Sequence, residues 1–141
     1  MSEENKALVR ALLEAADRSD ISVLDQVLAD NYVDHNPPPF QGPATGADGA
    51  RDAFTTAMKI FSDWSHEVPQ QFSDGEFVIS RIIGRGRHTG DFLGIPASNK
   101  EVTMEGIAIH RVIDGKVVEH WSQVDGLGLL SQIGAIPPMG G

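Results

Sequence analysis

The sequence predicts an α+β domain, and three observations carry this prediction. Apolar residues recur at helical spacing in the first third of the chain, a segment rich in proline and glycine follows, and alternating strand patterns begin after Asp63. Helices that precede a run of antiparallel hairpins pack on one face of a curved sheet. We expect one domain over residues 1–136 and a flexible tail at 137–141.

Two helices are predicted at the start of the chain. Over Glu3–Asp17, apolar side chains recur every fourth residue and share one stripe. Asp20 or Ser22 can cap a short second helix that runs to Leu28, before Asp30-Asn31 breaks it. Both helices therefore offer an apolar face to the rest of the fold.

A surface loop and a third helix come next. The prolines and glycines of Tyr32–Gly49 force the chain out of helical geometry, so we expect a loop within the domain. The third helix is predicted from about Ala47 to Ile60, with Asp48 in its first turn, where the helix dipole favours a carboxylate.

Four strands and a short helix account for the remainder of the chain. The strands are predicted at Trp64–Phe72, Phe77–His88, Glu101–Val112 and Lys116–Val124. The last helix is predicted at Leu127–Ile133, with Asp125 as its N-cap and Gly134 just past its end.

Composition excludes several classes of function. The chain of 141 residues has a formal charge of -9, which repels a phosphate backbone, so nucleic acid is not an expected partner. It contains no cysteine, which excludes disulfides and fits a cytoplasmic location. No stretch approaches the roughly 20 apolar residues of a membrane span, and the start lacks a signal-peptide pattern, so we expect a soluble protein with no membrane partner.

The turn at Ile113-Asp114-Gly115 determines which side chains share a face. A three-residue loop would pair His110 with Val118, Ala108 with His120 and Gly106 with Ser122. One face then combines small residues with two imidazoles and a hydroxyl: Met104, Gly106, Ala108, His110, Val118, His120, Ser122 and Val124. Small residues on a curved sheet leave a void, so we expect a pocket on this face.

The opposite face of this hairpin mixes apolar and charged side chains. Ile107, Ile109 and Trp121 alternate with the inward set and lie among charges such as Arg111 and Glu119. Such a surface is typical of a sheet that a second subunit covers. We therefore expect a homodimer through this face.

Several segments carry a family resemblance. They are Asn31–Pro37, Gly86–Pro96, Arg111–Trp121, Asp125 and Gly128–Gly134. Together they resemble the SnoaL-like polyketide cyclases over about Lys6–Ile136. The resemblance implies the NTF2-like fold, a cone in which a strongly bent antiparallel sheet wraps around helices, with a dimer through the outer face of the sheet.

The resemblance also implies a reaction, from which this chain departs. The family's cyclases perform an intramolecular aldol addition with an aspartate as general acid/base, neutral polar groups around the enolate oxygen, and no metal or cofactor. Through the Asp-Gly-Lys turn, the aspartate position falls on Ser122, the supporting histidine on Ala108, the glutamine on Gly106 and the loop asparagine on Asp34. Loss of a general base costs about 10²–10⁴ in rate, so other residues must carry any chemistry.

Asp34 and His35 are the first candidates, because the resemblance places them at the pocket mouth. Partial burial would raise the pKa of Asp34 towards that of a working base, and His35 titrates near neutral pH. In the alternative interpretation, Asp34 accepts backbone N–H groups in an Asx turn while His35 packs at the surface.

Histidines on the predicted pocket face are the second candidates. His110 and His120 share that face, and His88 ends a strand next to it. Imidazoles around a cavity act as acids, bases or metal ligands, but a histidine on a half-buried strand is also commonly structural. No spacing favours a metal, so we expect neither metal nor cofactor. The predicted catalytic set is Asp34, His35, His110 and His120.

The predicted substrate contacts are Tyr32, Met58, His88, Phe92, Met104 and Ser122. Our leading hypothesis is a cofactor-free acid/base enzyme of cyclase, isomerase or hydrolase type that acts on a small apolar molecule with a carbonyl group. The alternative is a binding module for a hydrophobic metabolite, favoured by the loss of polar groups at Gly106, Ala108 and Ser122. An imidazole and a carboxylate that converge in an open cavity would support the enzyme.

Overall fold

Helix α1 (Ser2–Asp17) and the short helix α2 (Ser22–Val27) begin the fold, close to their predicted positions. The computed structural model describes residues 2–137, so the predicted tail lies outside the described residues except for Pro137. Helix α3 (Gly46–Ile60) follows the proline-rich loop, and α4 (Gly126–Gln132) comes last. In the described part of the chain, no helix is long and apolar enough to cross a membrane.

The sheet contains five strands in the order β1-β5-β4-β3-β2. Strands β3 (Phe77–His88) and β5 (Lys116–Val124) have the predicted bounds, whereas β2 (Phe61–Asp74) and β4 (Glu101–Ile113) extend further than predicted. These four strands pair antiparallel in chain order. The α+β fold class is confirmed.

Strand β1 (Leu28–Asp34) is absent from the prediction and pairs parallel with β5. The predicted break at Asp30-Asn31 is in fact extended chain, and the second helix ends at Val27. A strand distant in sequence satisfies the hydrogen-bonding groups of this segment, which a local pattern does not reveal. The sheet is therefore mixed: β2 to β5 form the expected antiparallel sheet, and β1 adds a parallel strand at its edge.

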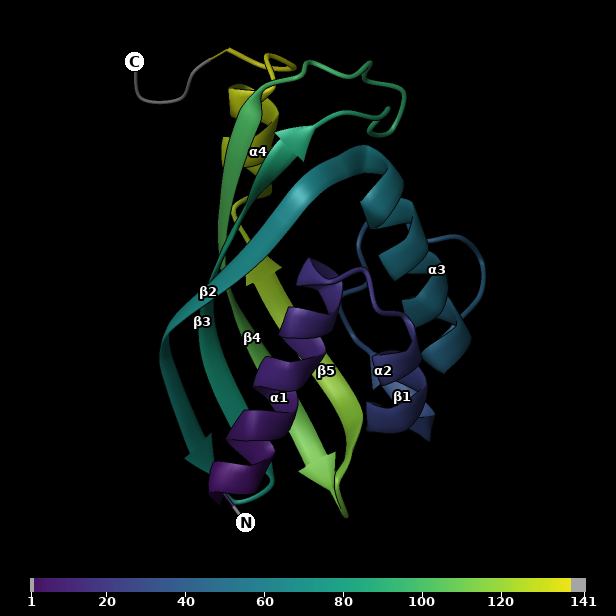
Figure 1. The fold of residues 1–141 in the computed structure, drawn as a ribbon, viewed down its shortest axis with the longest axis vertical. Helices are drawn as coiled ribbons and strands as arrows, with labels where there is room; N and C mark the ends of the chain where they lie inside the picture. Colours follow the sequence, from purple (N-terminus) through teal and green to yellow (C-terminus); the bar gives the residue numbers. More distant parts are fainter. Residues whose placement is uncertain (1, 138–141) are drawn as a thin grey trace.

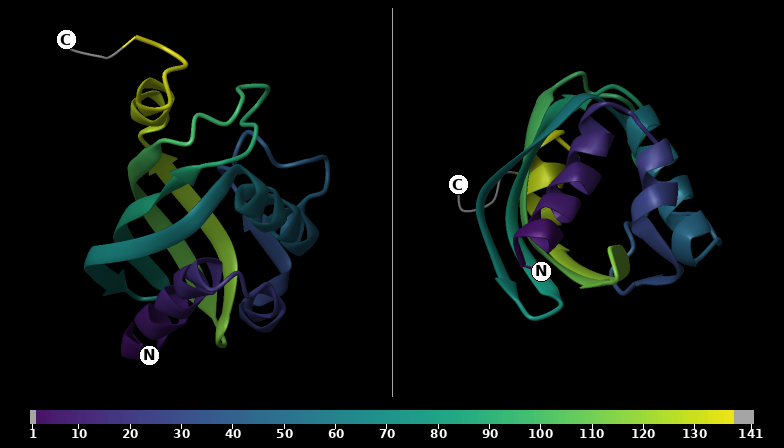
Figure 2. Two further views of the ribbon diagram at one scale, coloured as in Figure 1. Left: turned by 45° about the horizontal axis from the view of Figure 1, so that its top comes forward. Right: turned by 60° about the horizontal axis from the view of Figure 1, so that its bottom comes forward.

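The curved sheet wraps around the helices (Figures 1 and 2). Helix α1 lies against β2 and β3 on the concave side, and α3 lies against β1. In the right-hand view of Figure 2, the strands arch around α1 while α2 and α3 close the opposite side. This is the α+β cone that the resemblance implies.

The turn between β4 and β5 differs from the predicted three-residue loop. Ile113 pairs with Lys116, so the loop has two residues, Asp114 and Gly115. Their φ angles of 51° and 75° are the positive values that a type I′ turn requires. A β-bulge beside the turn then inserts one extra residue into β5.

Because of this bulge, the register between β4 and β5 differs from the predicted one. The inward-facing pairs are His110–His120, Ala108–Ser122 and Gly106–Val124. Each of these β4 residues pairs with a β5 residue two positions later in the sequence than predicted. Because side chains alternate along a strand, a shift of two residues leaves the side chains from His120 onwards on their predicted face. Val117 takes the buried place predicted for Val118, since it is 0% exposed.

Helix α4 ends as its sequence predicts. Asp125 caps its start by accepting a hydrogen bond from the Gly128 N–H at 2.9 Å. Beyond its end, Gly134 has a φ of 82°, and its N–H donates to the Ser131 carbonyl. Both end residues are confirmed.

Candidate active site

The inner face of the sheet has apolar ends and a polar middle. One buried cluster lies towards the β4–β5 turn: Val9, Leu24, Val27, Leu28, Tyr32, Val78, Val112 and Val117. A second cluster lies at the other end: Ile60, Phe61, Phe92, Val102, Leu129 and Ile133. Between them lie Asp34, Ser80, His110, His120 and Ser122. Burial of a polar group costs free energy unless the group is hydrogen-bonded, so the stability of this polar middle depends on the hydrogen-bond partners of these side chains.

Asp34 and His120 form a hydrogen-bonded pair in this polar middle. They are register partners on β1 and β5, and both side chains point to the inner side. His120 Nδ1 donates to Asp34 Oδ1 at 3.1 Å, and the two side chains are 19% and 16% exposed. With Nδ1 engaged, the lone pair of His120 Nε2 is left to take a proton from a ligand.

The structure combines the two interpretations of Asp34. Asp34 Oδ1 also accepts the Asn36 N–H at 3.0 Å, which is an Asx turn. Burial alone would raise the pKa of Asp34, but the hydrogen bonds from His120 and Asn36 and the nearby imidazoles lower it. The expected rise is therefore wrong. Asp34 is therefore ionised near neutral pH and accepts the hydrogen bond from His120 in that form.

His110 lies beside His120 on the buried side, with the two rings tilted by 30°. The ring centroids are 4.6 Å apart, and His110 is only 3% exposed. Its Nδ1 atom is buried with no hydrogen-bond partner among residues 2–137. Burial and the nearby charge of His120 lower the pKa of His110 to about 3, although Asp34 opposes this shift. His110 is therefore neutral near pH 7 and does not repel a proton on His120.

His35 lies on the opposite side of the sheet from Asp34. Its ring stacks on Trp121 with centroids 4.6 Å apart, and its Nε2 donates to Glu119 Oε2 at 2.9 Å. Arg111 Nη1 donates to the other oxygen of Glu119 at 2.9 Å. The placement of His35 in the pocket is corrected, because neighbouring residues in extended chain point to opposite faces.

The predicted substrate contacts occupy different environments. Tyr32 lies in the first cluster at 7% exposure, and burial and the charge of Asp34 raise its pKa, so its phenol stays protonated. Phe92 is buried in the second cluster, against which the partly exposed Met104 packs. Met58 on α3 is 37% exposed. Among these, Tyr32 lies nearest in sequence and on the same strand as Asp34.

His88 anchors the loop at residues 89–100. It is fully buried, and its Nδ1 accepts the Ser98 N–H at 3.1 Å. Its Nε2 atom is buried without a partner in the described part of the chain. This arrangement matches the structural interpretation that the sequence left open.

The structure contains a second histidine–aspartate pair, which the sequence analysis does not predict. On β2, His66 Nδ1 donates to Asp17 Oδ1 at 2.8 Å, and His66 Nε2 accepts the Trp64 indole N–H at 3.1 Å. Trp64 and His66 alternate within the predicted strand, which is a signal that both share a face. The partner Asp17 ends α1, and no local pattern links it to β2.

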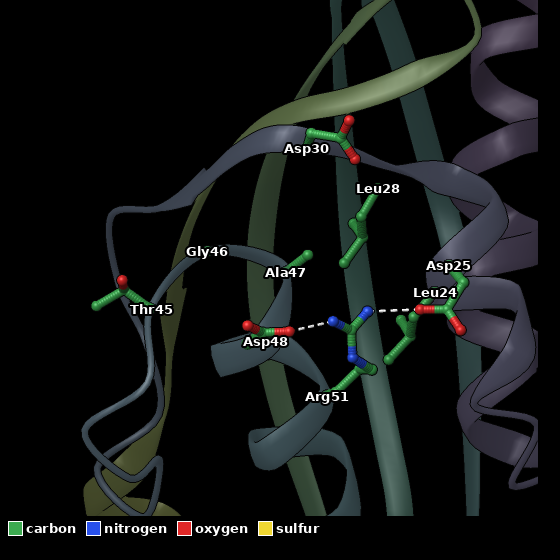
Figure 3. A pocket seen from close by; sticks show the side chains of 9 residues that line it. All are labelled: Leu24, Asp25, Leu28, Asp30, Thr45, Gly46, Ala47, Asp48 and Arg51. Atoms are coloured by element: carbon green, nitrogen blue, oxygen red, sulfur yellow. Dashed lines mark hydrogen bonds and ion pairs between the residues drawn. The ribbon is translucent and has the colours of Figure 1, made fainter.

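A cavity of about 430 Å³ lies between α2, β1 and the start of α3 (Figure 3). Arg51 spans it and bonds both Asp25 and Asp48. None of the predicted site residues lines this cavity. Because carboxylates occupy both ends of the guanidinium, we interpret Arg51 as a link between α2 and α3. Within residues 2–137, no group of three or more His, Asp or Glu side chains is placed to hold a metal ion.

Comparison with known proteins agrees with this fold. The family model described as SnoaL-like polyketide cyclase matches residues 6–133. The chain belongs to the SnoaL-like polyketide cyclase family. Aklanonic acid methyl ester cyclase DauD from Streptomyces sp. (strain C5) is 31% identical over 90% of this chain and 80% of its own. Nogalonic acid methyl ester cyclase from Streptomyces nogalater is 25% identical over 81% and 91%.

Solved structures share the fold of this SnoaL-like chain. TsrD from Streptomyces laurentii has a TM-score of 0.85 and 30% identity, over 95% of this chain and 97% of its own. IdmH from Streptomyces antibioticus has a TM-score of 0.81 and 27% identity, over 92% and 98%. The NTF2-like cone is therefore shown for essentially the whole described chain.

The polar pair of this SnoaL-like protein lies next to the positions that the resemblance assigns to the family's acid/base group. Ser122 and Ala108 face each other across β4 and β5, and the Ser122 N–H donates to Asn36 Oδ1 at 2.9 Å. A Cβ at Gly106 would lie 2.8 Å from the Gln123 carbonyl oxygen, so a glutamine there would require β5 to move. The next inward-facing pair along the ladder is His110 and His120.

Proposed function

We propose that this SnoaL-like chain is a cyclase in which His120 is the general base and Asp34 orients it. The observation that carries the proposal is the 3.1 Å hydrogen bond between His120 Nδ1 and Asp34 Oδ1 on the inner face. Ser122 cannot accept a proton near neutral pH, whereas an imidazole next to a carboxylate can. The proposed base, His120, therefore lies one inward-facing pair along the β4–β5 ladder from Ser122, the position that the resemblance assigns to the family's acid/base aspartate.

The reaction is an isomerisation that closes a ring. His120 Nε2 takes a proton from the carbon beside a carbonyl group, and the electrons of the C–H bond form an enolate. The enolate carbon attacks a second carbonyl of the same molecule, and the electrons of that C=O bond form an alkoxide. The alkoxide then recovers the proton from His120, so no atom is gained or lost.

Charge in the site suits this sequence of steps. Asp34 is ionised and stabilises the imidazolium of His120 after the first proton transfer. The low pKa of His110 keeps its ring neutral, so one positive charge forms beside one negative charge. Tyr32 stays protonated and can donate a hydrogen bond, as an enolate oxygen requires.

The substrate class follows from the relatives and from the lining of the cone. The relatives named above are cyclases of methyl esters. In this chain, apolar clusters enclose a middle that carries the Asp34 carboxylate, which disfavours a second carboxylate. We propose a small, largely apolar and uncharged ester with two carbonyl groups, turned over by side-chain chemistry without a cofactor.

Turnover of a methyl ester with His120→Ala and Asp34→Asn tests the assignment. We expect His120→Ala to lose about 10²–10⁴ in kcat, the typical contribution of a general base. Asp34→Asn should lose less, because the base remains but is less well oriented. His35→Ala removes an imidazole on the outer face and is the matched control. Wild-type turnover by His120→Ala would refute the proposal.

A binding module without chemistry remains the second candidate function. Gly106 and Ala108 bring no polar group to the inner face beside Ser122, which favours retention of a ligand without reaction. In that case the protein binds the ester and releases it unchanged in both the wild type and His120→Ala. Formation of the cyclic product by the wild type would exclude this candidate.

We propose that the protein is a homodimer through the outer face of the sheet. Exposed apolar side chains there include Phe77 at 39% and Ile107 at 53%. Ion pairs such as Arg85–Glu67 lie on the same face, and a second copy would offer charges of both signs to them. Sedimentation should show a dimer that Ile107→Glu dissociates, and a monomeric wild type would contradict this.

The cysteine-free composition supports a cytoplasmic location.

A further inference from the structure

We propose that Asn36 is a positioning residue that holds the Asp34 carboxylate against His120. The inference rests on the proposed function and adds to it the residue that keeps the base oriented. Asn36 lies two residues beyond the end of β1, at the start of the proline-rich loop. It is exposed, so it contributes through its hydrogen bonds rather than through apolar packing.

Asp34 lies at an end of β1 that the sheet holds over a short stretch. It is the last residue of β1, which is an edge strand. The register with β5 is irregular between Leu28 and Val33, so the regular pairing that ends at Asp34 begins only at Val33. Pro37 has no N–H and cannot extend the ladder. An edge strand paired over so short a stretch frays unless other contacts fix its end.

Asn36 supplies such contacts from both its side chain and its backbone. Its Oδ1 accepts the Ser122 backbone N–H of β5 at 2.9 Å. Its own backbone N–H donates to Asp34 Oδ1 at 3.0 Å. Between them, the His35 N–H donates to the His120 carbonyl oxygen at 2.9 Å. The Asn36 side chain thus provides an acceptor to β5 where β1 has already ended.

The contacts form a closed loop that begins and ends on β5. From Ser122 the loop runs through Asn36 to Asp34 Oδ1, and the same oxygen accepts His120 Nδ1 at 3.1 Å. Because Asn36 precedes Pro37, its backbone is restricted to extended conformations, which also restricts the carboxylate bonded to it. Removal of the Asn36 side chain opens the loop and leaves the backbone N–H of residue 36 without its anchor on β5.

Orientation is what a general base needs from its partner. The lone pair of His120 Nε2 must point at the reacting C–H bond, and an error of about 1 Å in position costs roughly 100-fold in rate. We expect Asn36→Ala to lower kcat by roughly 10- to 100-fold and to leave KM within about twofold of wild type. The loss should not exceed that of Asp34→Asn, since Asn36 acts through Asp34.

The first experiment needs no substrate. Long-range ¹H–¹⁵N spectra of the histidine rings, recorded in mildly alkaline buffer where imidazoles are neutral, report which ring nitrogen carries the proton. We expect wild-type His120 to be protonated on Nδ1, and Asn36→Ala to show the signals of the Nε2–H form as well. His66, whose Nδ1 donates to Asp17 Oδ1 at 2.8 Å, is the internal control and should not change. His120→Ala assigns the signals.

A double-mutant cycle separates positioning from a general loss of structure. In an Asp34→Asn background, Asn36→Ala should have no further effect on turnover of the methyl ester, because the carboxylate that it holds is already gone. Asn36→Asp keeps an oxygen acceptor at the same place and should restore both the tautomer and the rate. If Asn36→Ala does not fold, Asn36→Leu, which has the size of asparagine and no acceptor, gives the same comparison.

Gln132→Ala is the matched control. The Gln132 side chain also bonds the backbone of the sheet, since it accepts the Thr103 N–H and donates to the Thr103 carbonyl oxygen, each at 2.7 Å. It joins α4 to β4 and does not contact the Asp34–His120 pair. Its removal should lower the free energy of unfolding and leave the His120 tautomer and kcat as in the wild type.

A pure Nδ1–H tautomer of His120 in Asn36→Ala would overturn the proposal, and so would an equal loss of kcat with and without Asp34. A tautomer change of the same size in Gln132→Ala would also overturn it. The tautomer does not depend on which residue is the base. Wild-type turnover by His120→Ala therefore refutes the assigned base alone, whereas an unchanged tautomer together with an inactive His120→Ala refutes the role of Asn36 alone.

Discussion

His35 and Trp121 stack nearly parallel on the outer side of the sheet, with ring planes within 8° of each other. The preceding residue, Asp34, bonds to His120 on the inner side. One step along the chain thus separates a residue of the candidate site from a residue of the surface. The surface that contains His35 also holds Arg111 and Glu119, the charges expected at a subunit interface.

The first prediction follows from this separation. His35→Ala removes the stacking on Trp121 and the hydrogen bond to Glu119, so we expect the free energy of unfolding to fall by about 1 kcal/mol. Turnover per folded molecule should stay within about twofold of wild type, because the ring does not reach the cone. Urea unfolding and initial rates measure the two effects. A hundredfold loss of turnover would return His35 to the site.

His110 makes stability depend on pH in a defined window. Its pKa in the folded protein is about 3, below the ordinary value of 6.5. Between these values the unfolded chain binds a proton that the folded chain does not, so the free energy of unfolding falls as pH drops from 6.5 towards 3. We expect a loss on the order of a few kcal/mol, measured by urea unfolding across this range.

The control for this prediction is His110→Leu. An apolar side chain of similar size removes the titrating group and should flatten that part of the stability profile. If His110→Leu and the wild type lose stability in parallel, His110 is not the group responsible.

The pairing of strands explains how much of the site the sequence could predict. The alternation of side chains along strands predicts that His110 and His120 share one face, and the bulge near Gly115 does not alter this. Their partner Asp34 reaches them through the parallel strand β1, which forms only against β5. No local pattern contains that pairing, so the contact could not be derived.

The charge state of Asp34 could not be predicted for a related reason. Burial raises a carboxyl pKa, whereas the hydrogen bond and charge of His120, together with the local Asx turn to Asn36, reverse the shift. The Asx turn is visible in the sequence, but the presence of His120 beside Asp34 depends on tertiary structure. The helices and the strands β3 and β5, by contrast, follow from periodicity and turn residues that are local.

Asp34 provides a third prediction, at lower pH than His110. Its pKa is lowered from 3.8 in the folded protein, so its ionised form contributes stability that is present above pH 3.8 and is lost as pH falls through the folded value. Asp34→Asn should remove this acid-dependent part. Because the Asp34 charge raises the pKa of His110, its removal lowers that pKa further, so the loss of stability that begins below pH 6.5 persists. Urea unfolding of the wild type and Asp34→Asn from pH 5 downwards separates the contribution of Asp34 from that of His110. An unchanged acid limb in Asp34→Asn would contradict the assigned hydrogen bonds.

Asp125 should stabilise α4 through its cap. The carboxylate accepts the Gly128 N–H at 2.9 Å, and α4 has only seven residues. We expect Asp125→Ala to lower the free energy of unfolding by about 1 kcal/mol, and Asp125→Asn or Asp125→Ser to keep most of it, because both still accept the hydrogen bond. Equal loss in all three variants would show that the charge, and not the cap, matters.

The last prediction concerns the contact between Gly86 and Trp64. A Cβ at Gly86 would lie 2.6 Å from Trp64 Cε3 and 3.0 Å from the Ser62 carbonyl oxygen, so Gly86→Ala must displace the indole or strain the sheet. We expect a loss of about 1–3 kcal/mol, the usual cost of overpacking. Gly75→Ala is a poor control, since its φ of 59° is strained for alanine, whereas Gly42 has open space around it. Gly42→Ala should therefore be nearly neutral.

Trp64→Leu should reduce the cost of Gly86→Ala, and a double-mutant cycle measures that coupling. Additive losses would mean that Trp64 does not lie on Gly86.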